Sequence, residues 1–186
     1  MDKGIIFIIG GARSGKSSFA LNEASKIKGQ KAYIATAEAL DSEMKERIEM
    51  HKKLRRNEWD TYEEPIKIAE LIGTVGDKYK VVLVDCLTLW LSNVMLQSKQ
   101  PENAITEFLQ VLGSLSRSSS STRLNSLNGF NGLNLFIVSN EVGMGIVPDN
   151  KMAREFRDWA GFLNQKIAEI ADEVYLVTAG IPVKIK

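Results

Sequence analysis

The sequence has little of several features, and each shortage excludes a class of protein. Its 186 residues include one cysteine, so no intrachain disulfide forms and nothing favours an oxidising compartment. No apolar run approaches the roughly 20 residues of a membrane span, and no signal-peptide pattern opens the chain. The 24 Lys and Arg residues are balanced by 23 Asp and Glu residues, so no overall positive field favours nucleic acid. We therefore expect a cytoplasmic protein with no nucleic-acid partner.

The remaining composition is that of an ordinary globular protein, with 44% hydrophobic and 25% charged residues. A chain of this length can bury its own core, so residues 1–186 are predicted to form a single domain. One stretch differs from the rest: residues 117–131 are rich in Ser and Asn. Such a composition buries little apolar surface and predicts a flexible surface insertion.

Short apolar runs alternate with helical patterns along the chain. Buried strands are predicted at residues 5–9, 32–35, 81–84 and 133–138, and helices at 17–28, 41–56, 65–73, 87–96 and 102–115. A longer helix is predicted from a cap at Asp149 to about residue 171, followed by a hairpin of residues 174–178 and 181–185. Strands that alternate with helices predict an α/β layered fold with a largely parallel sheet.

One motif carries most of the functional information. Residues 10–17 read GGARSGKS and match the phosphate-binding pattern G-x-x-x-x-G-K-[ST] between a predicted strand and a predicted helix. Its glycines let backbone N–H groups approach a phosphate, and the helix N-terminus adds positive potential. Lys16 can reach the β- and γ-phosphates, and the Ser17 hydroxyl can bind Mg²⁺. We predict a P-loop that binds ATP or GTP through Gly10, Gly11, Ala12, Arg13, Ser14, Gly15, Lys16 and Ser17.

Asp85 follows the predicted strand 81–84, where P-loop proteins place a second group that holds Mg²⁺. An aspartate after a buried strand can also serve only as a turn or cap residue, but the P-loop favours the metal role. We predict that Ser17 and Asp85 hold the metal, directly or through water. The adjacent Cys86 is interpreted as a small packing residue rather than a nucleophile.

The single histidine, His51, lies on an unusual predicted helix. Helical spacing groups seven residues on one side: Leu40, Met44, Arg47, Ile48, His51, Leu54 and Arg55. One interpretation is a histidine at the edge of the core, with the arginines extending outward. The other is a nucleotide site in which the arginines neutralise phosphate and the imidazole attacks phosphorus. Helix geometry alone does not decide between them.

The motifs resemble those of the bifunctional adenosylcobinamide kinase and adenosylcobinamide-phosphate guanylyltransferase family, over nearly the whole chain. The matching segments are GGARSGKS at 10–17, YIAT at 33–36, DSEMKERIEMHKKLR at 41–55, W-x-T-x-E at 59–63, VLVDCLTLWLSN at 82–93 and the stretch from Ser139 to the C-terminus. The P-loop is shared by many families. NEVGMGIVP at 140–148, followed by R-x-F-R-D-x-A-G-x-x-N-Q at 154–165, is far more specific.

The resemblance implies two activities on a P-loop (RecA-like) three-layer α/β fold with a mainly parallel sheet. ATP or GTP would first phosphorylate the hydroxyl of the aminopropanol arm of adenosylcobinamide. GTP would then guanylylate a histidine with loss of pyrophosphate, and the GMP would pass to adenosylcobinamide phosphate to give adenosylcobinamide-GDP. The family's histidine nucleophile falls on His51, with Mg²⁺ and Lys16 stabilising the departing pyrophosphate.

The resemblance also implies further nucleotide contacts and an assembly. The contacts fall on Ala35, Thr36, Ala37, Lys52, Lys53, Leu54, Arg55, Glu63 and Asp85. Other members can carry Glu where this chain has Asp85, which has a shorter side chain. A homotrimer is expected from the resemblance alone. The insertion at 117–131 departs from more compact members and is expected to leave the chemistry intact.

Several alternatives stay open. The segment 141–145 follows a buried strand and is either a glycine turn or a functional loop for corrinoid or subunit contact. Arg154, Arg157 and Asp158 either bind substrate phosphate or form surface pairs. A simple P-loop kinase with a structural His51, a guanylyltransferase without the kinase step, a DNA-associated ATPase and a binding module are competing functions; the balanced charge disfavours the DNA-associated one. The sequence identifies neither the kinase base, the corrinoid pocket nor the nucleotide preferred in the kinase step.

Overall fold

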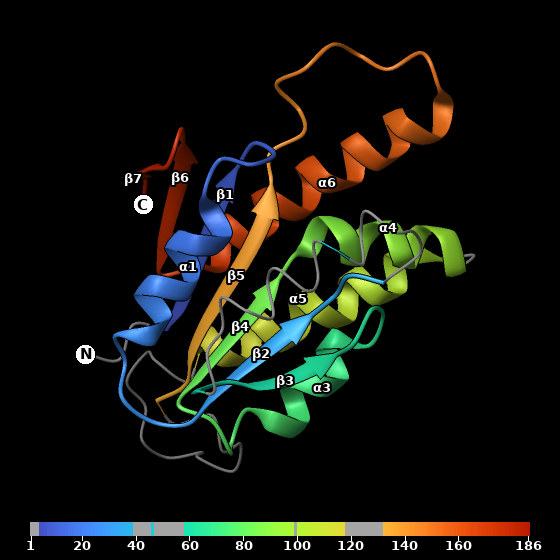
Figure 1. Cartoon of the computed structure of the whole chain (residues 1–186). Helices are drawn as coiled ribbons and strands as arrows, with labels where there is room; N and C mark the ends of the chain where they lie inside the picture. The colour runs from blue at the N-terminus through green and yellow to red at the C-terminus, as the bar shows by residue number, and fades with distance from the viewer. Residues whose placement is uncertain (1–3, 39–45, 47–57, 99, 118–131) are drawn as a thin grey trace.

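The computed structural model describes residues 4–38, 46, 58–98, 100–117 and 132–186. At its centre is a seven-stranded sheet with the order β3-β2-β4-β5-β1-β6-β7 (Figure 1). The strands are β1 (Ile5–Gly10), β2 (Lys31–Ala35), β3 (Asp60–Glu63), β4 (Val81–Asp85), β5 (Asn134–Asn140), β6 (Glu173–Thr178) and β7 (Ile181–Lys184). Every neighbouring pair is parallel except β6 and β7, which are antiparallel. The predicted mainly parallel sheet and C-terminal hairpin are confirmed.

Helices cover both faces of the sheet and complete three layers. Those among the described residues are α1 (Lys16–Ser25), α3 (Ile68–Val75), α4 (Leu87–Gln97), α5 (Pro101–Arg117) and α6 (Lys151–Ile170). Helix α1 lies on one face, and α3, α4, α5 and α6 lie on the other (Figure 1). Among the described residues, none of the helices combines the length and the apolar character that crossing a bilayer requires.

The central strands are apolar on both faces because each face is covered by helices. In β1, Ile5 and Phe7 join the core under α3 to α6, whereas Ile6 and Ile8 join the core under α1. All four side chains are buried. This two-sided burial explains why the strand reads as a continuous apolar run rather than an alternating one.

The structure corrects several element boundaries. Helix α6 is capped by Asn150, whose side chain accepts a hydrogen bond from the N–H of Ala153 at 3.2 Å, so the predicted cap at Asp149 is wrong by one residue. Helix α3 begins at Ile68 rather than at Pro65, because the Glu64 carboxylate accepts the N–H groups of Ile66 and Lys67 in a preceding turn. Helix α1 ends at Ser25, three residues before the predicted end.

One strand was not predicted from the sequence, and most of two predicted segments lies outside the described residues. Strand β3 has the sequence DTYE at the edge of the sheet, and three of its four residues are exposed, so it carries no apolar signal. The helix predicted at 41–56 lies outside the described residues except for Glu46. The insertion predicted at 117–131 lies outside them after residue 117.

The parallel register brings the carboxyl ends of several strands to one edge of the sheet. Gly10 of β1 is opposite Asn140 of β5, and Asp85 of β4 is opposite Ala35 of β2. Ala35 is in turn opposite Glu63 of β3. In open parallel sheets this edge is where ligands bind.

Candidate nucleotide-binding site

The P-loop connects the end of β1 to the start of α1, as its sequence pattern predicted. Its backbone requires glycine at two positions, one because of a close contact and one because of a positive φ. A Cβ atom on Gly10 would lie 2.4 Å from the carbonyl oxygen of Val177, and Gly15 has a φ of +92°. Side chains at either position would force the loop apart or strain it. The loop therefore keeps its backbone N–H groups at the N-terminus of α1, where they suit an anion.

Lys16 is the first residue of α1, and only 7% of it is exposed. Its Nζ donates a hydrogen bond to the carbonyl oxygen of Gly11 at 3.0 Å, so the ammonium turns back over the loop. Burial lowers its pKa below the ordinary lysine value, and the neighbouring Cys86 and Asp85 partly oppose this shift. A desolvated cation at the centre of a phosphate loop is well placed to bind the anionic groups of a nucleotide.

Ser17 and Asp85, which the sequence assigned to Mg²⁺, are brought together by the fold. The Ser17 Oγ donates to Asp85 Oδ1 at 3.2 Å. The second carboxylate oxygen, Oδ2, accepts a hydrogen bond from the hydroxyl of Tyr33 at 2.8 Å. Hydroxyl and carboxylate oxygens are the ligands that Mg²⁺ prefers, and a typical nucleotide site needs only a few from the protein because the phosphates supply the rest. The residues present therefore fit a magnesium–nucleotide complex.

Thr36, which follows β2, braces the backbone next to Asp85. Its side chain is fully buried, with Oγ1 donating to the carbonyl oxygen of Cys86 at 2.7 Å and accepting from the Cys86 N–H at 2.9 Å. The Thr36 N–H donates to the carbonyl oxygen of Asp85 at 3.3 Å. Because its hydroxyl already makes two hydrogen bonds inside the protein, the structure gives Thr36 a supporting position. Its nucleotide contact stays a prediction.

The other predicted contacts on β2 and β3 lie at the same edge. The N–H of Glu64 donates to the carbonyl oxygen of Ala35 at 2.9 Å, which continues the pairing beyond Glu63. The buried Asn93 of α4 donates through Nδ2 to the carbonyl oxygens of Thr36 and Pro65. These bonds fix the segments that include Ala37 and Glu63 relative to each other. Direct contact of either residue with a nucleotide remains a prediction.

Part of the predicted site belongs to a segment outside the described residues. His51 and the adjoining Lys52, Lys53, Leu54 and Arg55 lie outside the described residues. The role of His51 as a nucleophile and the nucleotide contacts of the four residues after it therefore stay predictions.

Two features of the site had not been identified from the sequence. The Tyr33 hydroxyl donates a hydrogen bond to the Asp85 carboxylate. In the sequence, the only indication of a role for Tyr33 was its place in the YIAT segment. In addition, the N–H of Gly180, in the turn of the β6–β7 hairpin, donates to the carbonyl oxygen of Ser14 at 2.8 Å. Nothing in the local sequence near Gly180 indicates this contact, because it joins residues that are far apart in the chain.

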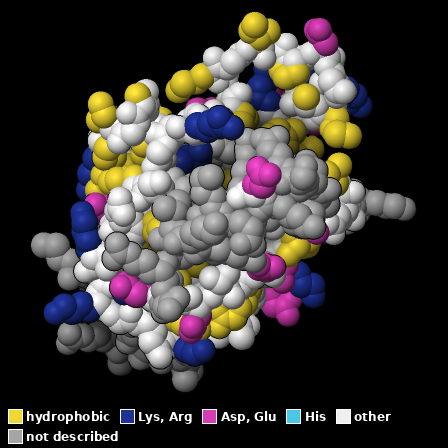
Figure 2. Space-filling view, viewed as in Figure 1, with side chains coloured by type: hydrophobic (Ala, Val, Ile, Leu, Met, Phe, Trp, Pro, Cys, Tyr) yellow, Lys and Arg dark blue, Asp and Glu magenta, His cyan; other side chains and the backbone are white. Residues whose placement is uncertain are grey.

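The loop between β5 and α6 begins as a glycine turn. The Glu141 carboxylate accepts the N–H of Gly143 at 2.8 Å and so takes part in the turn; a role of residues 141–145 in corrinoid or subunit contact stays a prediction. Beyond it, four large apolar side chains are exposed: Met144, Ile146, Val147 and Met152. Figure 2 shows hydrophobic side chains gathered along this loop, at the top of the view.

The charged residues of α6 have specific partners. Arg154 donates through Nη1 to the carbonyl oxygens of Pro148 and Asp149, so it closes the loop before α6. Asp158 pairs with Arg157 at 3.2 Å, rather than with Arg154 as the helical spacing suggested. These contacts give both arginines a structural position.

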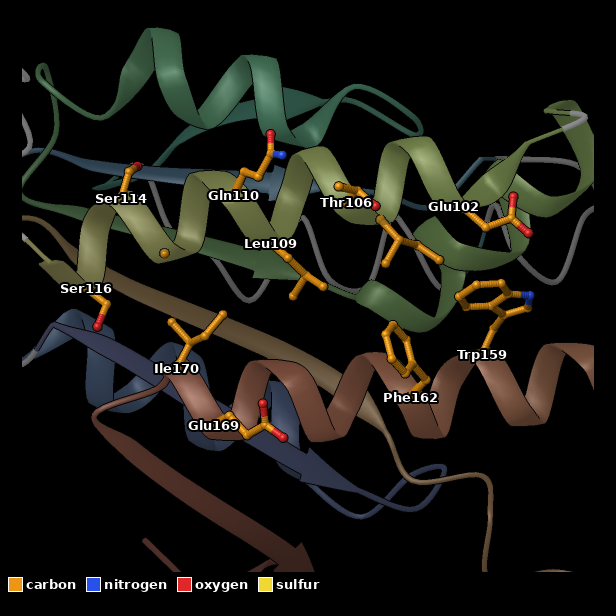
Figure 3. Close-up of a pocket in the computed structure, with 12 residues that line it drawn as sticks. Glu102, Thr106, Leu109, Gln110, Ser114, Ser116, Trp159, Phe162, Glu169 and Ile170 are labelled. Atoms are coloured by element: carbon orange, nitrogen blue, oxygen red, sulfur yellow. The ribbon is translucent and has the colours of Figure 1, made fainter.

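A separate pocket of about 720 Å³ lies between α5 and α6 (Figure 3). Its lining includes Leu109 of α5 and Trp159, Phe162 and Ile170 of α6, with Trp159 and Phe162 in an edge-to-face contact. All its lining residues belong to these two helices. The pocket is therefore distinct from the P-loop site.

Comparison with solved structures supports the fold assignment. The RadB recombinase superposes with a TM-score of 0.52 at 13% sequence identity, covering 94% of this chain and 74% of the recombinase. A second solved structure, of an ATPase domain, superposes with a TM-score of 0.50 at 12% identity, covering 94% of this chain and 69% of that domain. The chain therefore has a RecA-like P-loop fold, and at this identity the likeness extends to the fold alone.

Sequence comparison gives the family. Residues 6–185 match the family described as cobinamide kinase / cobinamide phosphate guanyltransferase. The bifunctional adenosylcobalamin biosynthesis protein CobU of Escherichia coli is 38% identical, over 98% of this chain and 99% of the relative. The bifunctional adenosylcobalamin biosynthesis protein CobP of Pseudomonas aeruginosa is 37% identical, over 96% and 95%. The chain thus belongs to the cobinamide kinase / cobinamide phosphate guanyltransferase family.

Proposed function

We propose that this protein is a bifunctional enzyme of cobalamin biosynthesis. It phosphorylates adenosylcobinamide with ATP or GTP, then transfers GMP from GTP to adenosylcobinamide phosphate and releases pyrophosphate. The observation that carries the proposal is the assembly of Lys16, Ser17 and Asp85 at one sheet edge, in a chain whose relatives are named bifunctional adenosylcobalamin biosynthesis proteins. It acts in the cytoplasm, without a nucleic-acid partner.

In the kinase step, the P-loop binds the triphosphate and Lys16 exchanges its bond to Gly11 for phosphate oxygens. Ser17 and Asp85 would hold Mg²⁺. Bound Mg²⁺ would neutralise the negative charge that develops on the phosphates. The substrate hydroxyl forms a bond to the γ-phosphorus while the bond from that phosphorus to the β-phosphate oxygen breaks. The nucleoside diphosphate leaves, and the hydroxyl proton passes to solvent. The protein's part in this step is to position the groups and to stabilise negative charge.

In the guanylyl step, His51 forms a bond to the α-phosphorus of GTP. The bond between that phosphorus and the oxygen of the β-phosphate breaks, and pyrophosphate leaves. A phosphate oxygen of adenosylcobinamide phosphate then attacks the same phosphorus and releases the histidine. Ala35, Thr36, Ala37, Glu63 and residues 52–55 contact the nucleotide. The proximity of the β2 and β3 ends to Asp85 supports this assignment for the first four.

We also propose, from the family resemblance, that the protein assembles as a homotrimer. Exposed apolar side chains on the β5–α6 loop are consistent with burial in an assembly. Sedimentation velocity tests this: a single species at three times the chain mass of 20.7 kDa is expected, and a monomer across the concentration range would contradict it.

Product analysis separates the proposed function from its competitors. Purified protein with Mg²⁺, GTP and adenosylcobinamide should yield first the phosphate and then adenosylcobinamide-GDP, identified by mass spectrometry. A simple kinase would stop at the phosphate, and a guanylyltransferase alone would need the phosphate supplied. Hydrolysis stimulated by DNA without a corrinoid product would favour the DNA-associated ATPase.

A further inference from the structure

The carboxylate of Asp85 is held at both of its oxygens. Ser17 donates to Oδ1, and Tyr33 donates to Oδ2 over the shorter distance of 2.8 Å. In the pairing of β2 with β4, Ala35 is opposite Asp85, and Tyr33 lies two residues before Ala35 in β2. Its side chain belongs to the core on the α1 side of the sheet, the side on which the P-loop helix lies. Tyr33 is thus a direct neighbour of the proposed metal site.

The Tyr33 ring has little freedom to move away. Tyr33 is 4% exposed, and the ring makes an edge-to-face contact with Trp59, with centroids 6.2 Å apart. Leaving a buried phenol hydroxyl without its hydrogen-bond partner costs free energy. Packing therefore fixes the hydroxyl, and the hydroxyl fixes the rotation of the carboxylate.

We propose that Tyr33 is a positioning residue for the metal site: by holding Oδ2, it directs Oδ1 of Asp85 toward Ser17. A carboxylate that is already oriented loses less freedom when it binds a cation, so the site has a higher metal affinity. The inference rests on the proposed function, in which Ser17 and Asp85 hold Mg²⁺.

Mn²⁺ binding provides a measurement that does not depend on turnover. Mn²⁺ replaces Mg²⁺, and electron paramagnetic resonance measures the free ion in titrations of the protein with a non-hydrolysable GTP analogue. Tyr33→Phe keeps the ring and removes the hydroxyl. We expect its Mn²⁺ dissociation constant to rise about tenfold, as for the loss of one hydrogen bond to a charged group. Tyr33→Met, which also lacks a donor and fills the space flexibly, should give a similar rise.

Tyr62→Phe is a matched control on the neighbouring strand β3. It also removes one phenol hydroxyl, but that hydroxyl contacts Tyr79 at 2.8 Å. Its Mn²⁺ affinity should equal that of the unmodified protein. A purely structural role for Tyr33 would lower the melting temperature without changing Mn²⁺ affinity, and that result would overturn the inference.

A double-mutant cycle with Asp85→Asn shows whether Tyr33 acts through Asp85. We expect Tyr33→Phe to cause no further loss of Mn²⁺ affinity in the Asp85→Asn background; a full additional loss there would contradict the inference. If Asp85→Asn weakens binding and Tyr33→Phe does not, the Tyr33 inference alone fails. If Asp85→Asn itself leaves Mn²⁺ affinity unchanged, the proposed metal role of Asp85 fails first.

Discussion

The N–H of Gly180 donates a hydrogen bond to the carbonyl oxygen of Ser14, so the C-terminal hairpin is tied to the P-loop. The approach is close enough that a Cβ atom on Gly15 would lie 3.2 Å from the Cα of Gly180. Because β7 is an edge strand and β6 pairs with β1, the hairpin turn lies directly against the loop that follows β1. The last strands of the chain therefore help to shape the phosphate site.

Gly180→Pro should weaken nucleotide binding about tenfold. Proline has no N–H to donate to Ser14, and its ring cannot adopt the φ of +81° found at Gly180. Gly180→Asn is the matched control, since asparagine tolerates positive φ, keeps the N–H and finds open space for its Cβ. Fluorescence titration with a labelled GTP analogue measures both variants. Equal affinity of Gly180→Pro and the unmodified protein would show that the hairpin does not support the loop.

Nucleotide affinity should fall as pH rises through a range below that of an ordinary lysine. Burial lowers the pKa of Lys16 in the free protein, and the charged form is the one that binds phosphate. Rising pH therefore removes the binding form, while bound phosphate favours protonation. Lys16→Gln should bind weakly and with a flat profile in this range. Titrations between about pH 7 and pH 10 check this, and a parallel decline in Lys16→Gln would assign the effect to another group.

Thr36→Val should destabilise the fold by about 1–3 kcal/mol, because it leaves the buried N–H of Cys86 without its partner, whereas the Cys86 carbonyl oxygen still accepts the N–H of Trp90. Thr36→Ser keeps the hydroxyl and should cost less. Urea denaturation measures both variants. If Thr36→Val unfolds at the same urea concentration as the unmodified protein but binds nucleotide poorly, the hydroxyl acts on the nucleotide rather than on the backbone.

Cys86 should react slowly with iodoacetamide in the native protein at about pH 8, near the ordinary pKa of a thiol. The residue is 8% exposed, and burial, with the neighbouring Asp85 charge, raises the pKa of the thiol to about 11. The thiolate that would react is therefore scarce and covered. In denaturant the rate should rise at least tenfold, as followed by mass spectrometry. Fast native labelling would contradict the packing role assigned from the sequence.

The sequence predicted the features that depend on local pattern. The P-loop was recognisable because its glycines, Lys16 and Ser17 are contiguous, and the buried strands because their apolar runs are uninterrupted. The pairing of Ser17 with Asp85 followed from knowing that both lie at the same sheet edge in P-loop proteins.

Features that depend on distant residues were not predictable in this way. Strand β3 is polar and exposed, so only its pairing with β2 makes it a strand. The contacts from Tyr33 to Asp85 and from Gly180 to Ser14 join residues that only the strand order brings together. The cap of α6 was misplaced because Asp149 and Asn150 are both good cap residues, and only geometry selects the second.

The most direct test of the proposed function is covalent labelling with GTP that carries the label at the α-phosphate. With Mg²⁺, label should remain on the denatured protein, be labile to acid and stable to alkali, and transfer to adenosylcobinamide phosphate. His51→Ala should lose this label and keep transfer of the γ-phosphoryl group to adenosylcobinamide. Active protein that takes no label from α-labelled GTP or ATP would contradict the guanylyl-histidine mechanism and leave a simple P-loop kinase.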